Sequence, residues 1–579
     1  MKKKIIDVLL PLPFNQTFKY ICNFEEKLKL GDFVSVPFKN KMITGCVWEN
    51  KDKLKKKLPI QKIKNIEAKL DFPGLNIQNR DFVVWVSNYT MNNLGSILKL
   101  CLSVKEVFTK KKKIDLIKER PINPSIKKPL LTKEQLNAKN FIYKKINKKE
   151  FSTIVIDGVA GSGKTEVYFE AINKCLSEKK QVLVLLPEIS MTTQWFDRFK
   201  KRFKNNPLLW HSDIKISEKI RIWKSIIEGK ISIIVGARSA LFLPFKNLGL
   251  IIIDEEHDQS FKQEEGTIYN ARDMAVVRAK ISNIPIILCS ATLSIETKLN
   301  ILEKKYEAVK LKERYGKAGL PEVKIVDLAE NPPEKGTWLS NEVHKELKKT
   351  IQSGNQALFF LNRRGFAPYV FCNTHHKKIL CPNCDVGLVF HKKTDNLICH
   401  HCGYKSLLKD IEKFCKDSKK KCDFFLYGPG VERIYEEIQS INKNLNIKIL
   451  TSDVMKKKGE GEIIIRKFEK EEINIIIGTQ ILAKGHHFPK LTLVVIVDAD
   501  FGFMGGDLRA AEKTFQLLSQ VSGRSGRSEL SGKVLIQSTM ADNAILNNIK
   551  KFDLNGFFSE EINTRKESGL PPFKKLCSL

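Results

Sequence analysis

A short glycine-rich segment between two apolar stretches constrains the fold of this chain more than any other feature. The run Phe151–Ile156 is β-branched and apolar, which is typical of a buried strand in a parallel sheet. After Glu166, apolar residues recur at helical spacing. The segment between them, Gly158–Thr165, fits the pattern G-x-x-x-x-G-K-[ST]. Strand, loop and helix in this order predict a nucleoside triphosphate site, because glycines let backbone N–H groups approach phosphate oxygens.

The loop also supplies the side chains that a triphosphate needs. Lys164 can reach the β- and γ-phosphates, and the Thr165 hydroxyl can ligate Mg²⁺. The helix that follows directs the positive end of its dipole at the same phosphates. The predicted nucleotide-binding residues of the loop are Gly158, Gly161, Ser162, Gly163, Lys164 and Thr165.

An acidic cluster closes a second predicted strand. The apolar run Leu248–Ile253 is followed directly by Asp254 and Glu255. At the carboxyl end of a strand, Asp254 can hold Mg²⁺ while Glu255 orients and deprotonates the attacking water. Acidic clusters are commonly no more than solvated loops, but the phosphate loop earlier in the chain favours the catalytic interpretation.

Two arginines late in the chain complete the predicted chemistry. Arg524 and Arg527 lie in the glycine-flanked segment Gln520–Arg527 and can reach across a cleft to a γ-phosphate. Surface arginines ordinarily have no such role. These two arginines are candidates for γ-phosphate contact because the other motifs occur in the same chain. Those motifs include Ser290-Ala-Thr292 and Gly478-Thr-Gln480, each of which follows a predicted strand.

The order of apolar runs predicts the architecture. From Leu131 onward, strands and helices alternate in a doubly wound pattern, which predicts two α/β lobes of the same kind, with a Cys/His-rich interruption inside the second. The chain before this region alternates apolar and polar residues, which predicts a small β-rich unit. The strands that we expect are 151–156, 181–186, 231–235, 248–253 and 284–288 in the first lobe and 356–361, 447–450, 473–477 and 493–497 in the second.

The charge of the chain indicates a polyanionic partner. Its formal net charge is +35 and its pI is near 9.5, which suits nucleic acid. The alternative is the lysine bias of an AT-rich genome. No stretch reaches the ~18 continuous apolar residues of a membrane span, and the N-terminus lacks a cleavage site, so we expect a cytoplasmic protein without a membrane partner. In that reducing compartment, the 13 cysteines favour metal binding over disulfides.

Several longer strings resemble one family. The motifs together are similar to those of superfamily 2 helicases, whose motor is two RecA-like lobes that close on ATP. The chain more closely resembles the PriA family of primosomal replication-restart helicases, through residues 5 to about 573 with one gap. The strings are GVAGSGKTEVY at 158–168, LPEIS at 186–190, DEEHD at 254–258, ARD at 271–273, LNRRG at 361–365 and LAKGHHFP at 482–489.

The resemblance implies an ATP-dependent helicase that moves 3′ to 5′ on single-stranded DNA at abandoned replication forks. It implies that Gln135 reads adenine, and that the aromatic-rich stretch 261–272 couples DNA contact to hydrolysis, with Tyr269 stacking on a base. The implied partners are forked and single-stranded DNA, single-strand-binding protein and other primosome proteins. Two alternatives stay open: a fork-binding primosome scaffold with little unwinding, and a translocase that remodels protein–DNA complexes. The other implied DNA-coupling residues are Arg272, Lys484, His486 and His487.

The cysteine block predicts bound zinc. Cys381-Pro-Asn-Cys384 and Cys399-His-His-Cys402 are two C-x-x-C pairs, and two such pairs complete a tetrahedral Zn²⁺ site. The family inserts a two-zinc module here, but its outer pairs are altered in this chain. His375 follows Cys372 and is a legitimate ligand, whereas Ser418 follows Cys415 and is not, although the nearby Cys422 can replace it. A second site is therefore an open possibility.

These observations predict the following domains. A β-rich DNA-binding domain spans 1–104, a basic linker 105–128, the first helicase lobe 129–310, the second lobe 311–370 and 426–550, a zinc-binding insertion 371–425, and the beginning of a truncated C-terminal domain 551–579. The family's winged-helix domain is missing where the linker stands. Lys19 stands between Phe18 and Tyr20, where the family carries an aspartate that recognises a nascent 3′ end. We therefore expect weak discrimination of a 3′-hydroxyl.

Overall fold

The computed structural model describes most of the chain as two compact units. The first unit contains residues 1–293 and 300–313, and the second contains residues 294–299 and 314–579. The described residues are 4–23, 27–49, 63–109, 116–117, 129–187, 193–314, 319–361, 369–372, 374, 377–383, 387–391, 395–399, 402–415, 422–427, 430–451, 454–455, 459–479, 488–503, 507–525 and 530–576.

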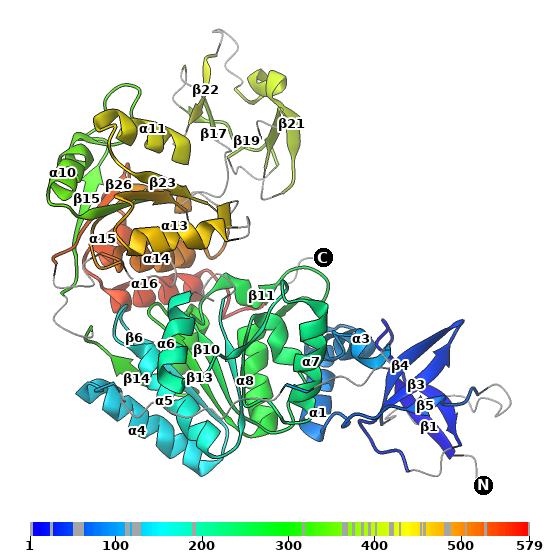
Figure 1. Ribbon diagram of the computed structural model, residues 1–579. Coiled ribbons are helices and arrows are strands. Elements are labelled where there is room, and N and C mark those ends of the chain that lie inside the picture. Colours follow the sequence, from blue (N-terminus) through cyan, green and yellow to red (C-terminus); the bar gives the residue numbers. More distant parts are fainter. Residues whose placement is uncertain are drawn as a thin grey trace. The chain divides into compact units, whose positions relative to one another are not determined.

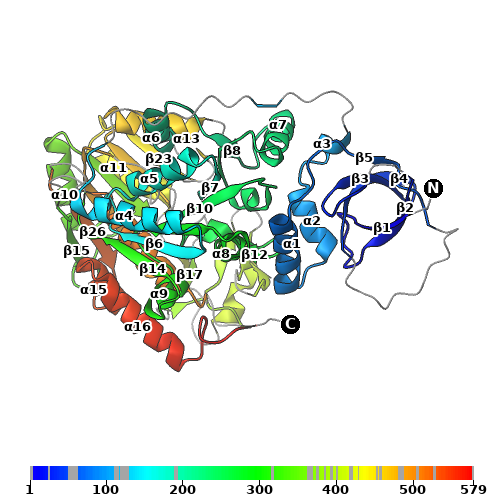
Figure 2. The ribbon, with the colours of Figure 1, turned by 90° about the horizontal axis from the view of Figure 1, so that it is seen from below.

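The chain begins with a five-stranded antiparallel sheet. Its strands follow the order β2-β1-β4-β3-β5, and side chains such as Val8, Val34 and Val36 form its own apolar core. A backbone bridge between Ile21 and Asn65 connects β2 to the segment before β5, and Figure 2 shows the strands curled into a ring. The strands are β1 (Lys4–Leu9), β2 (Phe18–Cys22), β3 (Phe33–Phe38), β4 (Lys41–Val47) and β5 (Ala68–Lys69).

The first lobe is a seven-stranded parallel sheet with helices on its faces (Figure 1). The strand order is β14-β6-β13-β10-β7-β9-β8. Its strands are β6 (Ser152–Gly158), β7 (Gln181–Leu185), β8 (Leu208–Trp210), β9 (Ile233–Gly236), β10 (Leu248–Asp254), β13 (Pro285–Ser290) and β14 (Glu307–Leu311). Its helices are α4 (Lys133–Lys148), α5 (Lys164–Ser177), α6 (Thr193–Phe203), α7 (Ile216–Ile227) and α8 (Ala271–Ser282), with η3 (Arg238–Phe242), η4 (Gln259–Phe261) and the hairpin β11 (Lys262–Gln263) and β12 (Tyr269–Asn270).

Three helices fasten the N-terminal sheet to the first lobe. They are α1 (Ile77–Thr90), α2 (Leu94–Cys101) and α3 (Glu106–Thr109). The Trp223 indole of α7 donates a hydrogen bond to the Cys101 carbonyl (2.8 Å), and Arg278 Nη2 of α8 donates to Asn79 Oδ1 of α1 (2.8 Å). Arg278 is buried among these contacts, and burial lowers its pKa to about 10. The N-terminal residues therefore share one packed unit with the first lobe.

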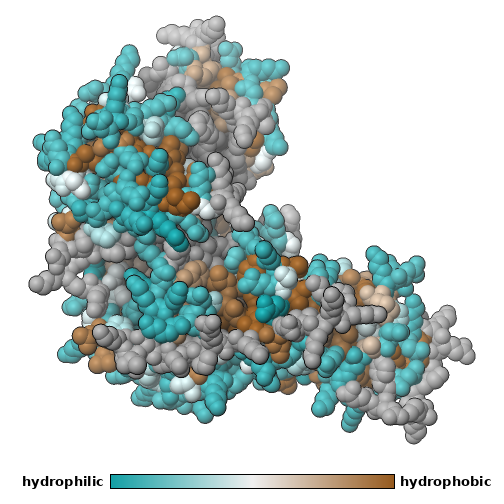
Figure 3. All heavy atoms as spheres, viewed as in Figure 1, coloured by the Kyte–Doolittle hydropathy of each residue, from teal (hydrophilic) through white to brown (hydrophobic). Residues whose placement is uncertain are grey.

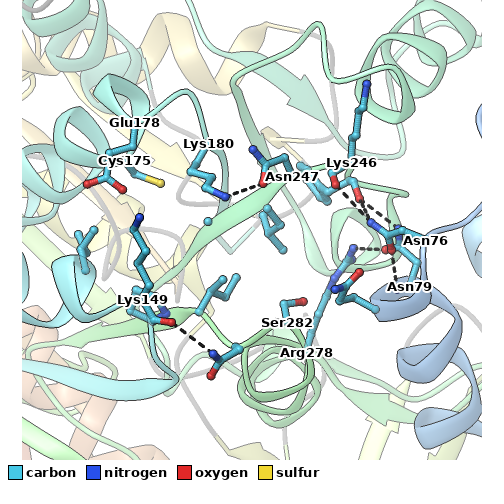
Figure 4. A pocket seen from close by; sticks show the side chains of 18 residues that line it. Asn76, Asn79, Lys149, Cys175, Glu178, Lys180, Lys246, Asn247, Arg278 and Ser282 are labelled. Carbon is cyan, nitrogen blue, oxygen red and sulfur yellow. Dashed lines mark hydrogen bonds between the residues drawn. The ribbon is translucent and has the colours of Figure 1, made fainter.

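A pocket of about 310 Å³ lies beside this joint. Figure 4 shows Asn76, Asn79 and Arg278 close together on one side of it, and Lys180 hydrogen-bonded to Asn247 (2.8 Å) on another. The lining includes residues that directly precede or begin β7, β10 and β13. In a parallel sheet, ligands bind at the carboxyl ends of the strands, and the amino ends lie at the opposite edge. The pocket is therefore separate from the predicted nucleotide site.

The second lobe is a six-stranded parallel sheet in the order β15-β26-β25-β16-β24-β23. Its strands are β15 (Glu322–Asp327), β16 (Gln356–Leu361), β23 (Ile447–Leu450), β24 (Ile475–Gly478), β25 (Leu491–Asp498) and β26 (Lys533–Ser538). Its helices are α10 (Asn341–Gln352), α11 (Val431–Ile441), α13 (Glu460–Glu469), α14 (Ala510–Ser522), α15 (Ala544–Lys550) and α16 (Leu554–Glu567). The start of α9 (Ile295–Leu302) belongs to the same unit, since Ile295 N donates to the buried Glu512 carboxylate (3.0 Å).

A small β module interrupts the second lobe. Its strands are short, and four cysteines contribute to its apolar core. Its elements are β17 (Tyr369–Cys372), β18 (Lys377–Lys378), β19 (Val389–His391), β20 (Asn396–Ile398), β21 (Lys405–Leu407), η5 (Leu408–Phe414) and β22 (Phe424–Tyr427).

The predicted α/β architecture with two parallel-sheet lobes is confirmed. Boundaries differ by small shifts: β9 begins at Ile233 and β24 at Ile475, each two residues later than expected. In the two parallel sheets, strands β8, β14, β15 and β26 were not predicted. The cysteines that the structure describes form no disulfide bonds. Among the described residues, no helix is both long and apolar enough to cross a membrane. Hydrophilic residues cover much of the face shown in Figure 3, as the net charge leads one to expect.

Candidate nucleotide site and zinc clusters

The glycine-rich loop joins the end of β6 to the start of α5. Gly163 has a φ of 79°, in the left-handed region that glycine adopts without steric cost. A Cβ atom there would lie 2.4 Å from Gln135 Nε2, so a larger residue would force a shift. Lys164 Nζ donates hydrogen bonds to the carbonyl oxygens of Gly158 (2.7 Å) and Val159 (3.2 Å). The loop therefore folds around its own lysine.

The donor set around the loop fits a phosphate group and a hard cation. Ser162 is 2% exposed, and its Oγ has no hydrogen-bond partner within the described part of the chain. An unpaired buried hydroxyl costs about 1–3 kcal/mol, which a phosphate oxygen would recover. Thr165, in the first turn of α5, and Asp254, at the end of β10, offer oxygen atoms, the ligands that Mg²⁺ prefers. The residues present fit a magnesium–nucleotide complex.

Gln135 caps helix α4 and contacts the loop. Its Oε1 accepts a hydrogen bond from Thr132 N (3.0 Å), while Thr132 Oγ1 accepts one from Gln135 N (3.3 Å), which is a capping box. Its Nε2 donates to the Ser162 carbonyl (2.8 Å). Both ends of the amide are engaged with the protein, and the expected contact with adenine stays a prediction.

The two predicted carboxylates lie at the carboxyl end of β10. Asp254 Oδ2 accepts a hydrogen bond from the Tyr168 hydroxyl (2.9 Å), and Oδ1 accepts one from Glu255 N (3.0 Å). Burial raises the pKa of Asp254 above its ordinary value, and the charge of Glu255 acts in the same direction. Glu255 has a φ of 52°, and such outliers cluster at active sites. Its side chain is 28% exposed, so water can reach it.

A histidine connects this strand end to the next. His257 Nδ1 lies 2.7 Å from Ser290 Oγ, at the end of β13, and 3.7 Å from Glu255 Oε2. Ser290 Oγ also donates to the Thr292 carbonyl (2.8 Å) and accepts from Thr292 N (3.0 Å). Because the serine proton goes to Thr292, Ser290 accepts from His257, whose Nδ1 therefore carries a proton. The Ser-Ala-Thr motif is thereby joined to Glu255, a link that its sequence did not reveal.

The stretch predicted to couple DNA contact to hydrolysis is connected, through Arg272, to the turn that carries Asp254 and Glu255. This residue begins α8 and pairs with Glu256 (Nη1–Oε2, 3.2 Å) and with Asp273 (Nε–Oδ1, 2.8 Å). Glu256 is buried and directly follows Glu255. Arg272 is itself 7% exposed, so its position suits a relay between segments better than direct contact with DNA.

Tyr269 occupies a different position from the one expected. It is 5% exposed, and its ring meets the Phe242 ring edge-on with 5.2 Å between centroids. Burial raises the pKa of its hydroxyl to about 12. A base cannot stack on a ring that protein already covers, so the expected stacking role disagrees with this structure. The expectation came from the family resemblance of the stretch 261–272, which does not say whether this tyrosine is buried.

Part of the predicted second-lobe chemistry falls within the described residues. Arg524 follows the end of α14 and is 5% exposed, and its N–H donates to the Val521 carbonyl (3.0 Å). Thr479 follows β24 and is 8% exposed. The remaining predicted residues, Lys484, His486, His487 and Arg527, lie outside the described residues.

Three thiols from the two C-x-x-C pairs come together. The Sγ atoms of Cys381, Cys399 and Cys402, which we call the inner cluster, lie within 4.8 Å of one another, and Cys381 and Cys402 are 3.5 Å apart. Zn–S bonds of about 2.3 Å in a tetrahedron place sulfurs about 3.8 Å apart, so this spacing fits Zn²⁺. The fourth expected ligand, Cys384, lies outside the described residues.

A second group of thiols forms the outer cluster, Cys372, Cys415 and Cys422, whose Sγ atoms also lie within 4.8 Å of one another. Cys372 and Cys415 are buried. The inclusion of Cys422 supports the expectation that it replaces Ser418 as a ligand. His375 lies outside the described residues, so its expected role as the fourth ligand stays a prediction.

The lobes and their motifs define a class of protein. Residues 132–301 match the DEAD/DEAH box helicase family, and residues 405–529 match the helicase conserved C-terminal domain. Among solved structures, RecG bound to a three-way DNA junction is similar with a TM-score of 0.46 and 17% identity, over 86% of this chain and 55% of that chain. The two family matches, one to each lobe, place the chain in the helicase class.

More specific matches narrow this class to one family. Residues 7–103 match a 3′ DNA-binding domain, and residues 381–406 match the Cys-rich region of the PriA DNA helicase. The replication restart protein PriA of Rickettsia conorii is 42% identical over 578 residues, which are 100% of this chain and 87% of that protein. The PriA of Bacillus subtilis is 37% identical over 77% of this chain and 55% of that protein. The chain belongs to the PriA family of replication restart proteins.

Proposed function

We propose that this protein is an ATP-dependent DNA helicase that moves 3′ to 5′ on single-stranded DNA and remodels abandoned replication forks, so that the replicative helicase can be reloaded. One observation carries the proposal: the loop around Lys164 and the pair Asp254 and Glu255 follow parallel strands of one sheet, β6 and β10, with only β13 between them. A second lobe with the same fold and the match to helicase families support a motor rather than a simple nucleotide-binding domain.

Its proposed partners are forked and single-stranded DNA, single-strand-binding protein and other primosome proteins, which it meets in the cytoplasm. The net charge of +35 and the match of residues 7–103 to a 3′ DNA-binding domain support the DNA partners. The protein partners rest on the family alone. The match of residues 381–406 to the Cys-rich region supports bound zinc.

Nucleotide binding would begin with an exchange of contacts in the loop. Lys164 leaves the Gly158 and Val159 carbonyls for the β- and γ-phosphates, and Ser162 Oγ gains the hydrogen-bond partner that it lacks within the described residues. Backbone N–H groups of the loop and the dipole of α5 bind the same negative charge. Mg²⁺, held by Thr165 and Asp254, would supply positive charge beside the phosphate oxygens.

Hydrolysis would then depend on Glu255. Its partly exposed carboxylate orients the attacking water and accepts a proton from it. His257, bonded to Ser290, lies beside this carboxylate and holds it in place. The Arg272–Glu256 ion pair connects the segment that follows, 261–272, to the turn that carries Glu255, so a movement of that segment would shift the base. Arg524 and Arg527 are the proposed ligands of the γ-phosphate from the second lobe.

The proposal predicts ATP hydrolysis that depends on DNA and a fixed direction of unwinding. Steady-state turnover should rise strongly when single-stranded or forked DNA is added. A partial duplex with a 3′ single-stranded tail should be unwound, and one with a 5′ tail should not. Hydrolysis without strand separation would instead support a scaffold or a translocase. Turnover that ignores DNA, measured on preparations free of contaminating nucleic acid, would contradict a helicase.

The N-terminal sheet leads to a prediction about DNA ends. Lys19 of β2 lies directly opposite Asp7 of β1, whose Oδ1 accepts a hydrogen bond from Thr17 (3.1 Å). An ammonium group can donate to phosphates but cannot accept from a 3′-hydroxyl. We expect forks ending in a 3′-hydroxyl and a 3′-phosphate to bind almost equally. Affinity should fall by roughly 0.9 log unit per log unit of salt for each duplex phosphate neutralised. Fluorescence anisotropy at two salt concentrations measures both quantities.

The Lys19→Asp variant is the matched test, because it restores an acceptor at that position. A hydrogen bond to a charged group contributes about 1.5–3 kcal/mol, so this variant should prefer the free hydroxyl by roughly tenfold or more. Asn15 is a poor substitute acceptor, since its Oδ1 already accepts from Leu94 N (3.0 Å). A salt-resistant preference for the hydroxyl in the unchanged protein would contradict the prediction. If Asp7→Asn then abolished it, Asp7 would be the acceptor.

A further inference from the structure

A buried tyrosine stands between the two residues proposed to hold magnesium. Tyr168 lies on α5, three residues after Thr165, and its side chain is fully buried. Its hydroxyl donates a hydrogen bond to Asp254 Oδ2 (2.9 Å), and Thr165 lies one turn earlier on the same helix, at the i, i+3 spacing of helical neighbours. Tyr168 therefore links the helix that carries one predicted oxygen ligand to the strand end that carries the other.

The direction of these hydrogen bonds is fixed by a tryptophan. Trp195 Nε1, on α6, lies 2.7 Å from the Tyr168 hydroxyl. An indole N–H can only donate, so the phenol oxygen must accept from Trp195, and its single proton is left for the Asp254 carboxylate. The contact with Asp254 is thus a directed donation, and its geometry depends on where α6 places Trp195.

A purely structural role explains less of this arrangement. The Tyr168 ring packs edge-on against Phe169 (5.4 Å between centroids), and phenylalanine would fill that space equally well. The hydroxyl adds no packing, and a buried hydroxyl is tolerated only when its hydrogen bonds are satisfied. The hydroxyl does satisfy the Trp195 N–H, which is a structural contribution, but it also donates to Asp254 Oδ2, which a structural role does not require.

We propose that Tyr168 is a positioning residue for the magnesium–nucleotide complex, and that Trp195 sets its orientation. The hydroxyl holds the Asp254 carboxylate against α5, the helix whose first turn carries Thr165. α6 is joined to α5 a second time by the buried ion pair of Arg202 with Glu170. A shift of α6 therefore changes the carboxylate that the metal would meet. The inference rests on the proposed function, since it concerns the same site.

The Tyr168→Phe variant removes the hydroxyl and keeps the ring. Partners of metal ligands typically contribute 10–100-fold to metal affinity, so we expect the Mg²⁺ concentration that half-saturates tight ADP binding to rise about tenfold. The measurement is the fluorescence of a labelled ADP during titration with MgCl₂, which needs no hydrolysis. Trp195→Phe, which removes only the donor to the phenol, should shift the midpoint in the same direction by less. ADP binding in EDTA should stay unchanged in both variants.

Tyr143→Phe is the matched control. Tyr143 of α4 also donates its hydroxyl to a buried carboxylate, Glu170 Oε2 (3.1 Å), but not to a proposed metal ligand. Its magnesium midpoint should equal that of the unchanged protein. Equal midpoints for Tyr168→Phe and the control, or an equal loss of ADP affinity with and without Mg²⁺, would overturn the proposal. If Tyr168→Phe does not fold, the Trp195→Phe midpoint decides. A protein that shows no DNA-dependent hydrolysis would contradict the proposed helicase function. The positioning role of Tyr168 would still be decided by the ADP titration.

Discussion

Replacing Glu255 with glutamine should stop ATP hydrolysis while leaving ATP bound. Glutamine keeps the shape of the side chain but cannot accept the proton of the attacking water. Loss of a general base typically lowers turnover by about 10²–10⁴-fold. Lys164 is held by the Gly158 and Val159 carbonyls, so the loop should still bind nucleotide in this variant. Single-turnover hydrolysis and nucleotide retention on a filter measure the two effects separately.

Two further variants show whether the effect belongs to Glu255. Lys164→Ala removes a charged contact with the phosphates, worth about 1.5–3 kcal/mol, so nucleotide affinity should fall roughly ten- to hundredfold. Glu303→Gln makes the same chemical change at a side chain that is 43% exposed and lies outside the segment 261–272, and it should leave both measurements unchanged. Near-normal turnover in Glu255→Gln would show that Glu255 is not the general base.

The parts of the site that lie within one strand–loop–helix unit could be predicted from the sequence. Gly158–Thr165 carries its own conformational requirements, because Gly163 needs a positive φ and Lys164 must follow it at the start of a helix. Asp254 and Glu255 were found in the same way, since they close an apolar run that can only be a buried strand. In both cases the residue types and their position directly after a strand indicate the same role in nucleotide binding or hydrolysis.

Contacts between elements far apart in the sequence could not be predicted. Trp195 and Tyr168 meet because α5 and α6 pack on the same face of the sheet. No local sequence pattern indicates that these two side chains form a buried hydrogen bond. The Ser290–His257 bond likewise requires β10 and β13 to be neighbours. Tyr269 shows a limit of the family resemblance, which implied a tyrosine that stacks on a base, whereas this side chain is buried against Phe242.

The zinc clusters fall between these cases. C-x-x-C spacing fixes two thiols on one turn, so the inner cluster was predictable, whereas Cys422 joins Cys372 and Cys415 only through the fold of the module.

Replacing Cys399, a member of the inner cluster, with serine should remove one zinc ion and unfold the module. Structural zinc contributes about 10–16 kcal/mol in small zinc peptides, more than the few apolar residues of this module can replace. Elemental analysis and limited proteolysis within 371–425 measure the two losses.

Replacing Cys422 with serine should be milder and should decide the composition of the outer cluster. If Cys422 is a ligand, zinc falls from two ions per chain to one, and the inner ion stays because its own cluster is intact. Mild chelation should remove the same ion first from the unchanged protein, more readily at low pH, since a histidine ligand binds only when deprotonated. Cys175→Ser, at a buried thiol in α5, is the matched control and should retain both ions. A stable content of two in Cys422→Ser would exclude Cys422 as a ligand, and a content of zero under mild chelation would contradict the inner site.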